Sequence, residues 1–160
     1  MTRLAVLAVG KLRNGAEREI AERYAKRIVA LAKSLGFSGF EAKEASLSRQ
    51  PTVEARRAAE AEAVLASIDR GRLVALDERG QSLSSDEFAG DIKSARDAGL
   101  AVYAIAIGGP DGHGERLRAR ADLMLSFGRM TWPHELVRAM AMEQLYRALT
   151  ILGGHPYHRA

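Results

Sequence analysis

The chain has 160 residues and no cysteine; 47% of its residues are hydrophobic, 28% are charged, and the formal net charge is +4. We expect residues 1–160 to form one domain, and the apolar content excludes an intrinsically disordered protein. No apolar run could span a bilayer, and Met1 leads directly into a predicted strand, so we expect a cytoplasmic protein without a membrane partner and without disulfide or thiol chemistry.

Positive charge is concentrated in the last third of the chain. Residues 1–112 hold 17 Lys and Arg against 16 Asp and Glu, whereas residues 113–160 hold 7 against 4, together with all four histidines. A basic segment of this kind suits an anionic partner such as nucleic acid.

The first third of the chain predicts a strand, a helix and a second strand. Residues 3–9 predict a strand that is buried on both faces, because residues 4–9 form a continuous apolar run. Apolar residues recur every three or four positions between 16 and 34, which predicts a helix. Residues 40–45 alternate weakly and predict a strand near a sheet edge, followed by a polar loop at 46–52.

The middle of the chain continues this alternation. Residues 53–68 are rich in Ala and Glu and predict a helix, and residues 72–76 predict a second buried strand that stops at residue 76. Ser84 and Glu87 have the spacing of a capping box at the start of a helix over 84–97. Strands that alternate with helices indicate an α/β fold, with a parallel sheet covered on both faces.

Two further predicted strands end in loops that could bind a ligand. Residues 101–107 (AVYAIAI) end at the glycine-rich segment 108–112 (GGPDG), and residues 123–125 end at 126–130 (SFGRM). Glycine lets the backbone approach a ligand closely, and ligands of open α/β sheets bind beyond the carboxyl ends of the strands. These loops are the candidate site, with ordinary turns as the alternative.

Several familiar motifs are absent. The segment 108–112 is neither a dinucleotide fingerprint nor a Walker loop, which favours a nucleoside-type ligand that touches the backbone over a phosphate cradle. His134 begins an HExxH-like pattern, but Arg138 occupies the second ligand position. His155 and His158 lack thiols and a nearby third ligand, so we expect no metal.

Charged residues beside the candidate site leave alternatives open. Asp77 follows a predicted strand and could accept from a ligand hydroxyl or hold a loop through Arg79. Arg116, Arg118 and Arg120 could form a solvated helix face or contact phosphate.

The last predicted helix spans 134–149 and is apolar along two stripes. Such a helix needs two packing partners, which could be deeper burial within one chain or a homodimer interface filled by methionines. The tail after this helix carries side chains that suit contacts with RNA: His155, Tyr157, His158 and Arg159.

Four segments together resemble one protein family. They are 73–80 (LVALDERG), 107–112 (IGGPDG), 125–148 (LSFGRMTWPHELVRAMAMEQLYRA) and 155–159 (HPYHR). The chain is similar, over essentially its whole length, to the large-subunit ribosomal pseudouridine N3-methyltransferases, small members of the SPOUT methyltransferases.

The resemblance implies a fold, a reaction and partners. The fold is a single-domain parallel-sheet α/β/α sandwich with a C-terminal trefoil knot. The protein would be a homodimer that uses S-adenosylmethionine to methylate N3 of one pseudouridine in 23S rRNA on the assembled ribosome. A non-catalytic ribosome- or RNA-binding factor that keeps the fold is the alternative, and the glycine pattern disfavours a nucleotide-dependent oxidoreductase.

The family's cofactor contacts can be carried over residue by residue. They fall on Leu76, Gly108, Leu125, Ser126, Phe127, Gly128, Arg129 and Met130. Phe127, Gly128 and Arg129 look like a variable stretch, which matters little if the contacts are mostly to the backbone. Residues 46–70 carry almost none of the resemblance and are expected to be scaffold.

The implied chemistry suggests catalytic residues. The imide N–H of a uracil-type ring has a pKa above neutrality and must lose its proton near the transfer step. We hypothesise that Arg138 or Arg159 stabilises the developing anion, and that His158 or a water takes the proton.

Overall fold

A five-stranded parallel sheet forms the centre of the computed structural model, which describes residues 1–159; Ala160 lies outside the described residues. The strand order is β2-β1-β4-β3-β5. The strands are β1 (Thr2–Val9), β2 (Phe37–Ala45), β3 (Gly71–Ser82), β4 (Val102–Ile107) and β5 (Leu123–Ser126). The helices are α1 (Ala16–Ala32), the 3-10 turn η1 (Lys33–Leu35), α2 (Val53–Leu65), α3 (Ser85–Asp97), α4 (Glu115–Arg120) and α5 (His134–Leu152).

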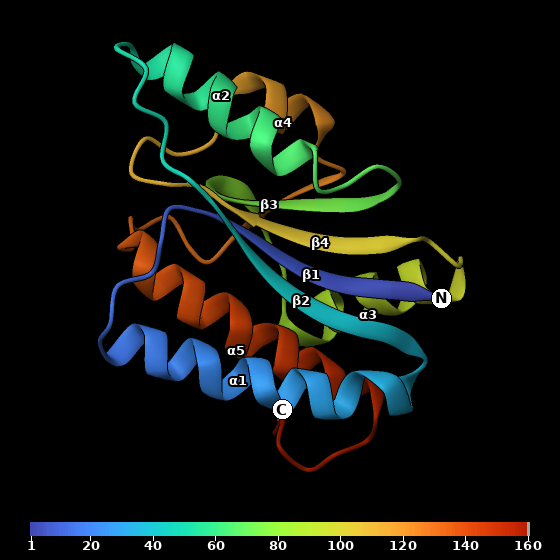
Figure 1. Ribbon diagram of the computed structural model, residues 1–160. Coiled ribbons are helices and arrows are strands. Elements are labelled where there is room, and N and C mark those ends of the chain that lie inside the picture. The colour runs from blue at the N-terminus through green and yellow to red at the C-terminus, as the bar shows by residue number, and fades with distance from the viewer. Residues whose placement is uncertain (160) are drawn as a thin grey trace.

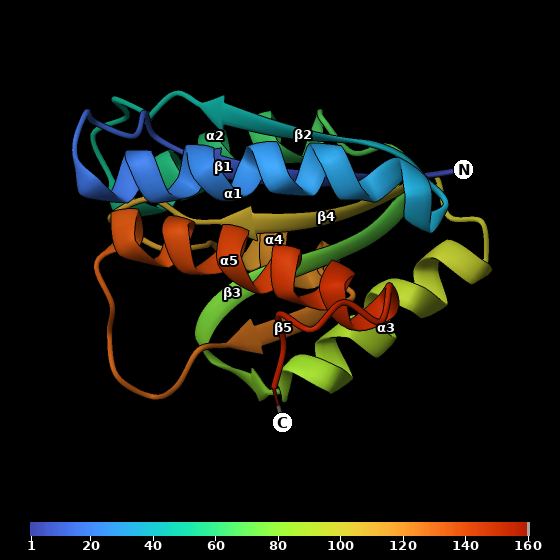
Figure 2. The ribbon, with the colours of Figure 1, turned by 90° about the horizontal axis from the view of Figure 1, so that it is seen from below.

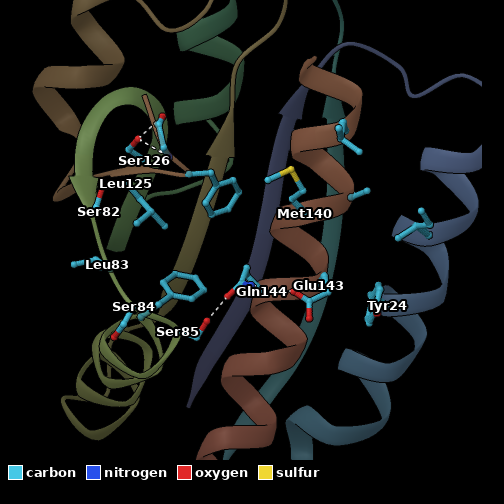
Figure 3. A pocket seen from close by; sticks show the side chains of 16 residues that line it. Tyr24, Ser82, Leu83, Ser84, Ser85, Leu125, Ser126, Met140, Glu143 and Gln144 are labelled. Carbon is cyan, nitrogen blue, oxygen red and sulfur yellow. Dashed lines mark hydrogen bonds between the residues drawn. The ribbon is translucent and has the colours of Figure 1, made fainter. Parts of the chain in front are cut away.

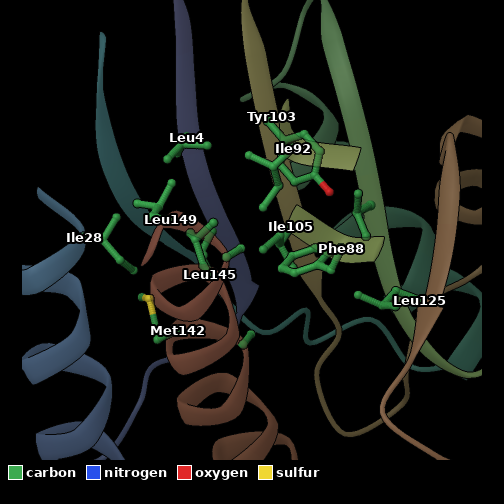
Figure 4. Close-up of a cluster of buried hydrophobic side chains, with 14 of the residues drawn as sticks. Leu4, Ile28, Phe88, Ile92, Tyr103, Ile105, Leu125, Met142, Leu145 and Leu149 are labelled. Atoms are coloured by element: carbon green, nitrogen blue, oxygen red, sulfur yellow. The ribbon is translucent and has the colours of Figure 1, made fainter. Parts of the chain in front are cut away.

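Helices cover both faces of the sheet, as the sequence predicted (Figure 1). Helices α2 and α4 lie on one face, and α1, α3 and α5 lie on the other, where Figure 2 shows them in front of the strands. Successive side chains of a strand point to opposite faces, so β1 supplies both cores. Leu4 and Val6 pack toward α1 and α5, and Leu7 packs toward α2. Figure 4 shows the first of these cores.

The strand β2 lies at a sheet edge, as predicted, but it begins at Phe37 rather than at residue 40. Gly36 adopts a left-handed conformation with φ of 86° and turns the chain out of η1 into the strand. Phe37 is fully buried beside Thr2 of β1. Ser38 and Gly39 interrupt the apolar alternation, which explains why the pattern pointed to a later start.

The prediction that β3 stops at residue 76 is wrong. Residues 74–76 pair with residues 123–125, and the pairing with β5 resumes at Gln81 after a register shift, so residues 77–80 leave the ladder and return. Gly80 permits the return, since a Cβ there would lie 2.5 Å from the carbonyl oxygen of Met124. This excursion leaves the side chains of 77–79 at the carboxyl end of the sheet.

Both apolar stripes of α5 are covered mainly within the chain. The buried apolar residues are Ala139, Ala141, Met142, Leu145, Ala148 and Leu149. Leu136 and Met140 remain partly exposed. Deeper burial therefore accounts for most of the helix. The knot implied by the resemblance stays a prediction. Within residues 1–159 no helix is long and apolar enough to cross a membrane.

Candidate functional site

A cavity of about 740 Å³ lies beyond the carboxyl ends of β4 and β5 and beside the excursion of β3 at residues 77–80. Six of the eight expected cofactor contacts line it: Leu76, Gly108, Leu125, Phe127, Gly128 and Met130. Ser126 and Arg129 do not. The wall also contains residues that the sequence did not single out as contacts, among them Arg57, Glu78, Ile107, His113, Thr131, Trp132, Pro133 and Val137.

The glycine-rich loop after β4 folds back on itself. The Gly112 amide donates to the Gly109 carbonyl at 2.9 Å, and Gly112 has a φ of 71°. A Cβ at Gly108 would lie 3.0 Å from the Gly112 carbonyl carbon. Gly108, Gly109 and Gly112 all line the cavity, so the loop presents backbone without side chains to it, and we call this segment the backbone cradle. The crowding at Gly108 shows that one added methyl group would force the cradle open.

Two arginines of α2 hold this loop in place. Arg56 Nε donates to the Asp111 carboxylate at 2.8 Å, and Arg57 Nε donates to the Asp111 carbonyl at 2.8 Å. The hydrogen bond from Arg56 holds the pKa of Asp111 below its usual value. Residues 46–70 were expected to be scaffold, yet α2 contributes one lining residue and two loop supports. No local pattern indicates this, because the partners are about 55 positions apart.

His113 follows the glycine-rich loop and attaches it to the strand β4. It is buried, and its Nε2 lies 3.1 Å from the Ala106 carbonyl oxygen of β4. A carbonyl can only accept, so the Nε2 atom carries the proton. Burial lowers the pKa of His113, although the hydrogen bond to Ala106 opposes the shift. The neutral ring thus ties the glycine loop to the strand that precedes it.

The β3 excursion forms the opposite wall. The Asp77 carboxylate accepts from the Arg79 amide at 2.9 Å and from Arg118 Nη2 at 3.0 Å. Of the alternatives for Asp77, the structure shows the one in which it holds a loop. Glu78 accepts from the Thr131 hydroxyl at 2.7 Å, which joins the excursion to the segment before α5.

The three arginines of α4 are ion-paired, and Arg116 remains exposed, as a solvated helix face requires, while contacts with phosphate stay a prediction. Besides Arg118, Arg116 pairs with Glu62 of α2, and Arg120 pairs with Asp122 at 3.1 Å. These contacts join α4 to α2 and to the turn before β5.

A second cavity of about 570 Å³ lies between α1, α5 and the start of α3 (Figure 3). Tyr24, Met140 and Glu143 face it from the two long helices, and the Ser85 hydroxyl donates to Gln144 Oε1 at 2.8 Å. Leu125, Phe127 and Gly128 line both cavities. The loop after β5 is therefore a shared wall.

The C-terminal tail is docked on α1 and α5 of its own chain. The Tyr157 hydroxyl donates to Glu143 at 2.9 Å and lies 3.0 Å from the Tyr24 hydroxyl. Burial, followed by these hydrogen bonds, raises the pKa of Tyr157. The Cζ atom of Arg147 lies 4.9 Å from the centre of the Tyr157 ring, and Arg147 Nη1 donates to His158 Nδ1 at 3.2 Å. His155 and Arg159 remain exposed.

The expected catalytic residues do not meet within one chain. None of the tail residues 155–159 lines the 740 Å³ cavity. Arg138 is 4% exposed and also does not line it. Its guanidinium donates to Glu44 of β2 and to carbonyl groups at the end of β1.

The cavity suits a nucleoside-type ligand. Its volume is in the usual range for small-molecule sites, roughly 300–1,000 Å³. Its wall combines apolar side chains and charged ones, such as Asp77 and Glu78, with the backbone of two loops, which can bind the edges of a base and a ribose. Among residues 1–159, no cluster of three or more His, Cys, Asp or Glu is placed to hold a metal ion.

Comparisons with known proteins agree with this geometry. A family model described as "Predicted SPOUT methyltransferase" matches residues 2–158. The chain is 52% identical over 159 residues to "Ribosomal RNA large subunit methyltransferase H" of Rhodopseudomonas palustris (strain TIE-1), and the alignment covers 99% of each chain. A protein of the same name from Brucella anthropi is 48% identical over 159 residues, with the same coverage.

A solved structure shares the fold at low sequence identity. It is a probable methyltransferase from Bordetella pertussis Tohama I, with a TM-score of 0.52 and 15% identity. The match covers 92% of this chain and 96% of that one.

Proposed function

Since the chain belongs to the SPOUT methyltransferase family, we propose that it methylates N3 of a pseudouridine in 23S rRNA on the assembled ribosome, with S-adenosylmethionine as methyl donor. The large-subunit ribosomal RNA substrate follows the names of the full-length relatives. The main structural support for this proposal is the 740 Å³ cavity. Gly108 of the glycine-rich loop and the loop after β5 both line it.

The residues of this cavity fit S-adenosylmethionine. Gly108 and the loop from Leu125 to Met130 would hold the nucleoside part through backbone groups, with Leu76 against the ring. The bound sulfonium compound supplies a methyl group that is already activated. The protein has to orient the RNA base, exclude water and manage the proton on N3.

We assign the proton and charge management to the tail. His158 Nδ1 accepts from Arg147, so in this docked position the neutral ring carries its proton on Nε2, 3.6 Å from Asp86. Taking the N3 proton would require His158 to leave Arg147 or to act through a water. Arg159 is exposed and can stabilise the anion, whereas the terminal nitrogens of Arg138 are already engaged within the protein.

No residue of the tail 155–159 lines the 740 Å³ cavity of its own chain, which supports a homodimer in which the tail of one copy completes the site of the other. A second copy would cover the other cavity, of about 570 Å³, which is lined by Leu136 and Met140 of α5 and by Ile20 of α1.

Complementation between two inactive variants tests this arrangement. Gly108→Val disables the cavity, and Arg159→Ala disables the tail. Co-expressed at equal amounts, they should regain about a quarter of wild-type activity, because half of the dimers carry one intact pair of cavity and tail. Activity that stays at zero in demonstrated mixed dimers would show that the tail acts on its own chain.

Methylation of ribosomes tests the function itself. Purified protein and labelled S-adenosylmethionine are added to ribosomes that lack the modification. The salt concentration is that of the cytoplasm, where we propose that the protein acts. A methyl group on N3 blocks base pairing, so reverse transcription should stop one nucleotide before the modified position. Ribosome binding without cofactor binding or label transfer would instead support the non-catalytic RNA-binding factor.

A further inference from the structure

Arg138 occupies a buried position that joins three elements of the fold. Its Nη1 donates to Glu44 Oε2 of β2 at 2.6 Å, and its Nη2 donates to the carbonyl of Gly10 at 2.9 Å and to that of Val9 at 3.3 Å. Glu44 Oε2 also accepts from the Leu12 amide at 2.7 Å. One side chain of α5 therefore fixes the carboxyl ends of β1 and β2 and the loop after β1.

These elements are the rear support of the candidate cofactor cavity. Arg138 lies in the second turn of α5, one residue after Val137, which lines the cavity together with the preceding segment 130–134. On the other side, the Val9 side chain lies against the glycine loop, since a Cβ at Gly109 would be 3.1 Å from Val9 Cγ1. The arginine thus connects two walls of the cavity.

Stability alone is a weak reason for such a group. Burying a charge costs solvation free energy, and apolar residues of similar volume often stabilise a fold as well or better. Arg138 Nε is buried and has no hydrogen-bond partner among the described residues, which adds to that cost. A forked guanidinium does provide fixed directions toward several acceptors at once, which a lysine cannot match.

We propose that Arg138 is a positioning residue, which sets the separation between the start of α5 and the glycine loop and thereby the affinity for the cofactor. This inference rests on the proposed function for the identity of the ligand. This positioning role replaces the earlier hypothesis that Arg138 contacts the RNA base and stabilises its developing anion.

A second ion pair nearby offers a matched control. Arg13, in the loop after β1, donates to Glu135 in the first turn of α5 at 3.0 Å. It joins the same two segments as Arg138, but the Arg13 side chain is 84% exposed. Exposed pairs contribute little, so Arg13→Met should change neither loop order nor cofactor affinity.

The test compares Arg138→Met, Arg138→Lys and Glu44→Gln with Arg13→Met. Hydrogen exchange of peptides covering 107–114 reports the order of the glycine loop without any ligand. Calorimetry with S-adenosylmethionine gives the Kd, and ribosome methylation gives kcat and KM across pH. All measurements are made well below each variant's Tm, and the two milder substitutions keep the test valid if Arg138→Met does not fold.

We expect Arg138→Met to speed exchange in the loop and to raise the cofactor Kd by about tenfold or more. Arg138→Lys and Glu44→Gln should give intermediate values. The kcat at saturating cofactor and its pH profile should change little. Two results would overturn the inference: loop exchange and Kd equal to wild type in folded variants, or a loss confined to kcat with a displaced pH profile, as a direct contact with the anion requires.

The exchange data also separate this inference from the proposed function. If wild-type protein binds no S-adenosylmethionine, the proposed function fails, while faster loop exchange in Arg138→Met alone still supports the positioning of the loop.

Discussion

Replacing Gly108 by alanine perturbs the backbone cradle at one point. The new Cβ would lie 3.0 Å from the Gly112 carbonyl carbon and 3.2 Å from the His113 amide nitrogen. Favourable carbon contacts begin near 3.5 Å, so the loop has to open by roughly 0.5 Å. His113 resists this movement because its ring is hydrogen-bonded to Ala106.

The size of the effect follows from this crowding. Overpacking by one methyl group in a closely packed site costs about 1–3 kcal/mol. Because the opened loop is the surface that would contact the cofactor, we expect the cost to weaken binding, with a rise in Kd of about 5- to 150-fold. Gly108→Val adds two further methyl groups and should abolish measurable binding.

Intrinsic fluorescence provides the assay. Trp132 is the only tryptophan of the chain and lines the cavity, so titration with S-adenosylmethionine should change its emission, and calorimetry gives an independent Kd.

Gly90→Ala is the control, since Gly90 lies exposed in α3 with no atom within 4 Å of the added Cβ. It should leave Kd unchanged and stabilise the helix by about 0.5–1 kcal/mol. If Gly108→Ala binds S-adenosylmethionine with the wild-type Kd, the glycine loop does not form part of the cofactor site.

Three further results are expected. Burial lowers the pKa of His113, so the unfolded chain binds its proton more readily and stability should fall as pH drops from about 6.5 toward the lowered value; His113→Gln should flatten that dependence in urea midpoints at pH 7.5 and 5.5. Tyr157→Phe loses the hydroxyl contacts to Tyr24 and Glu143, so hydrogen exchange in the tail should rise, and unchanged exchange would contradict the docking. Gly80→Ala would push a Cβ against the β5 backbone and should lower the Tm by several degrees.

Much of the fold could be predicted because its signals are local. Continuous apolar runs mark β1 and β4, whose residues are buried on both faces of the sheet. The Ser84 hydroxyl accepts from the Glu87 amide at 3.0 Å and starts α3 where the spacing predicted. The return of β3 after Leu76 was missed because it depends on a close backbone contact with a strand more than 40 residues away.

The candidate site likewise contains some features that the sequence predicts and others that it does not. The glycine loops were identified from strand ends, and the resemblance added the individual contacts. The supports from Arg56 and Arg57 could not be predicted, because a long-range pair leaves no periodic signal in one sequence. The placement of the tail on α1 and α5 likewise depends on tertiary packing, since Tyr24 and Tyr157 meet across 133 positions.

The wall shared by the two cavities has a thermodynamic consequence. A partner that occupies the cavity between α1 and α5 and contacts Leu125, Phe127 or Gly128 there touches the wall of the cofactor cavity from behind. A change in the cofactor affinity on that occupation must then be matched by an equal change in the affinity for the partner, because coupling between two sites is reciprocal. Cofactor loading would in that case control how tightly the protein holds whatever packs against its long helices.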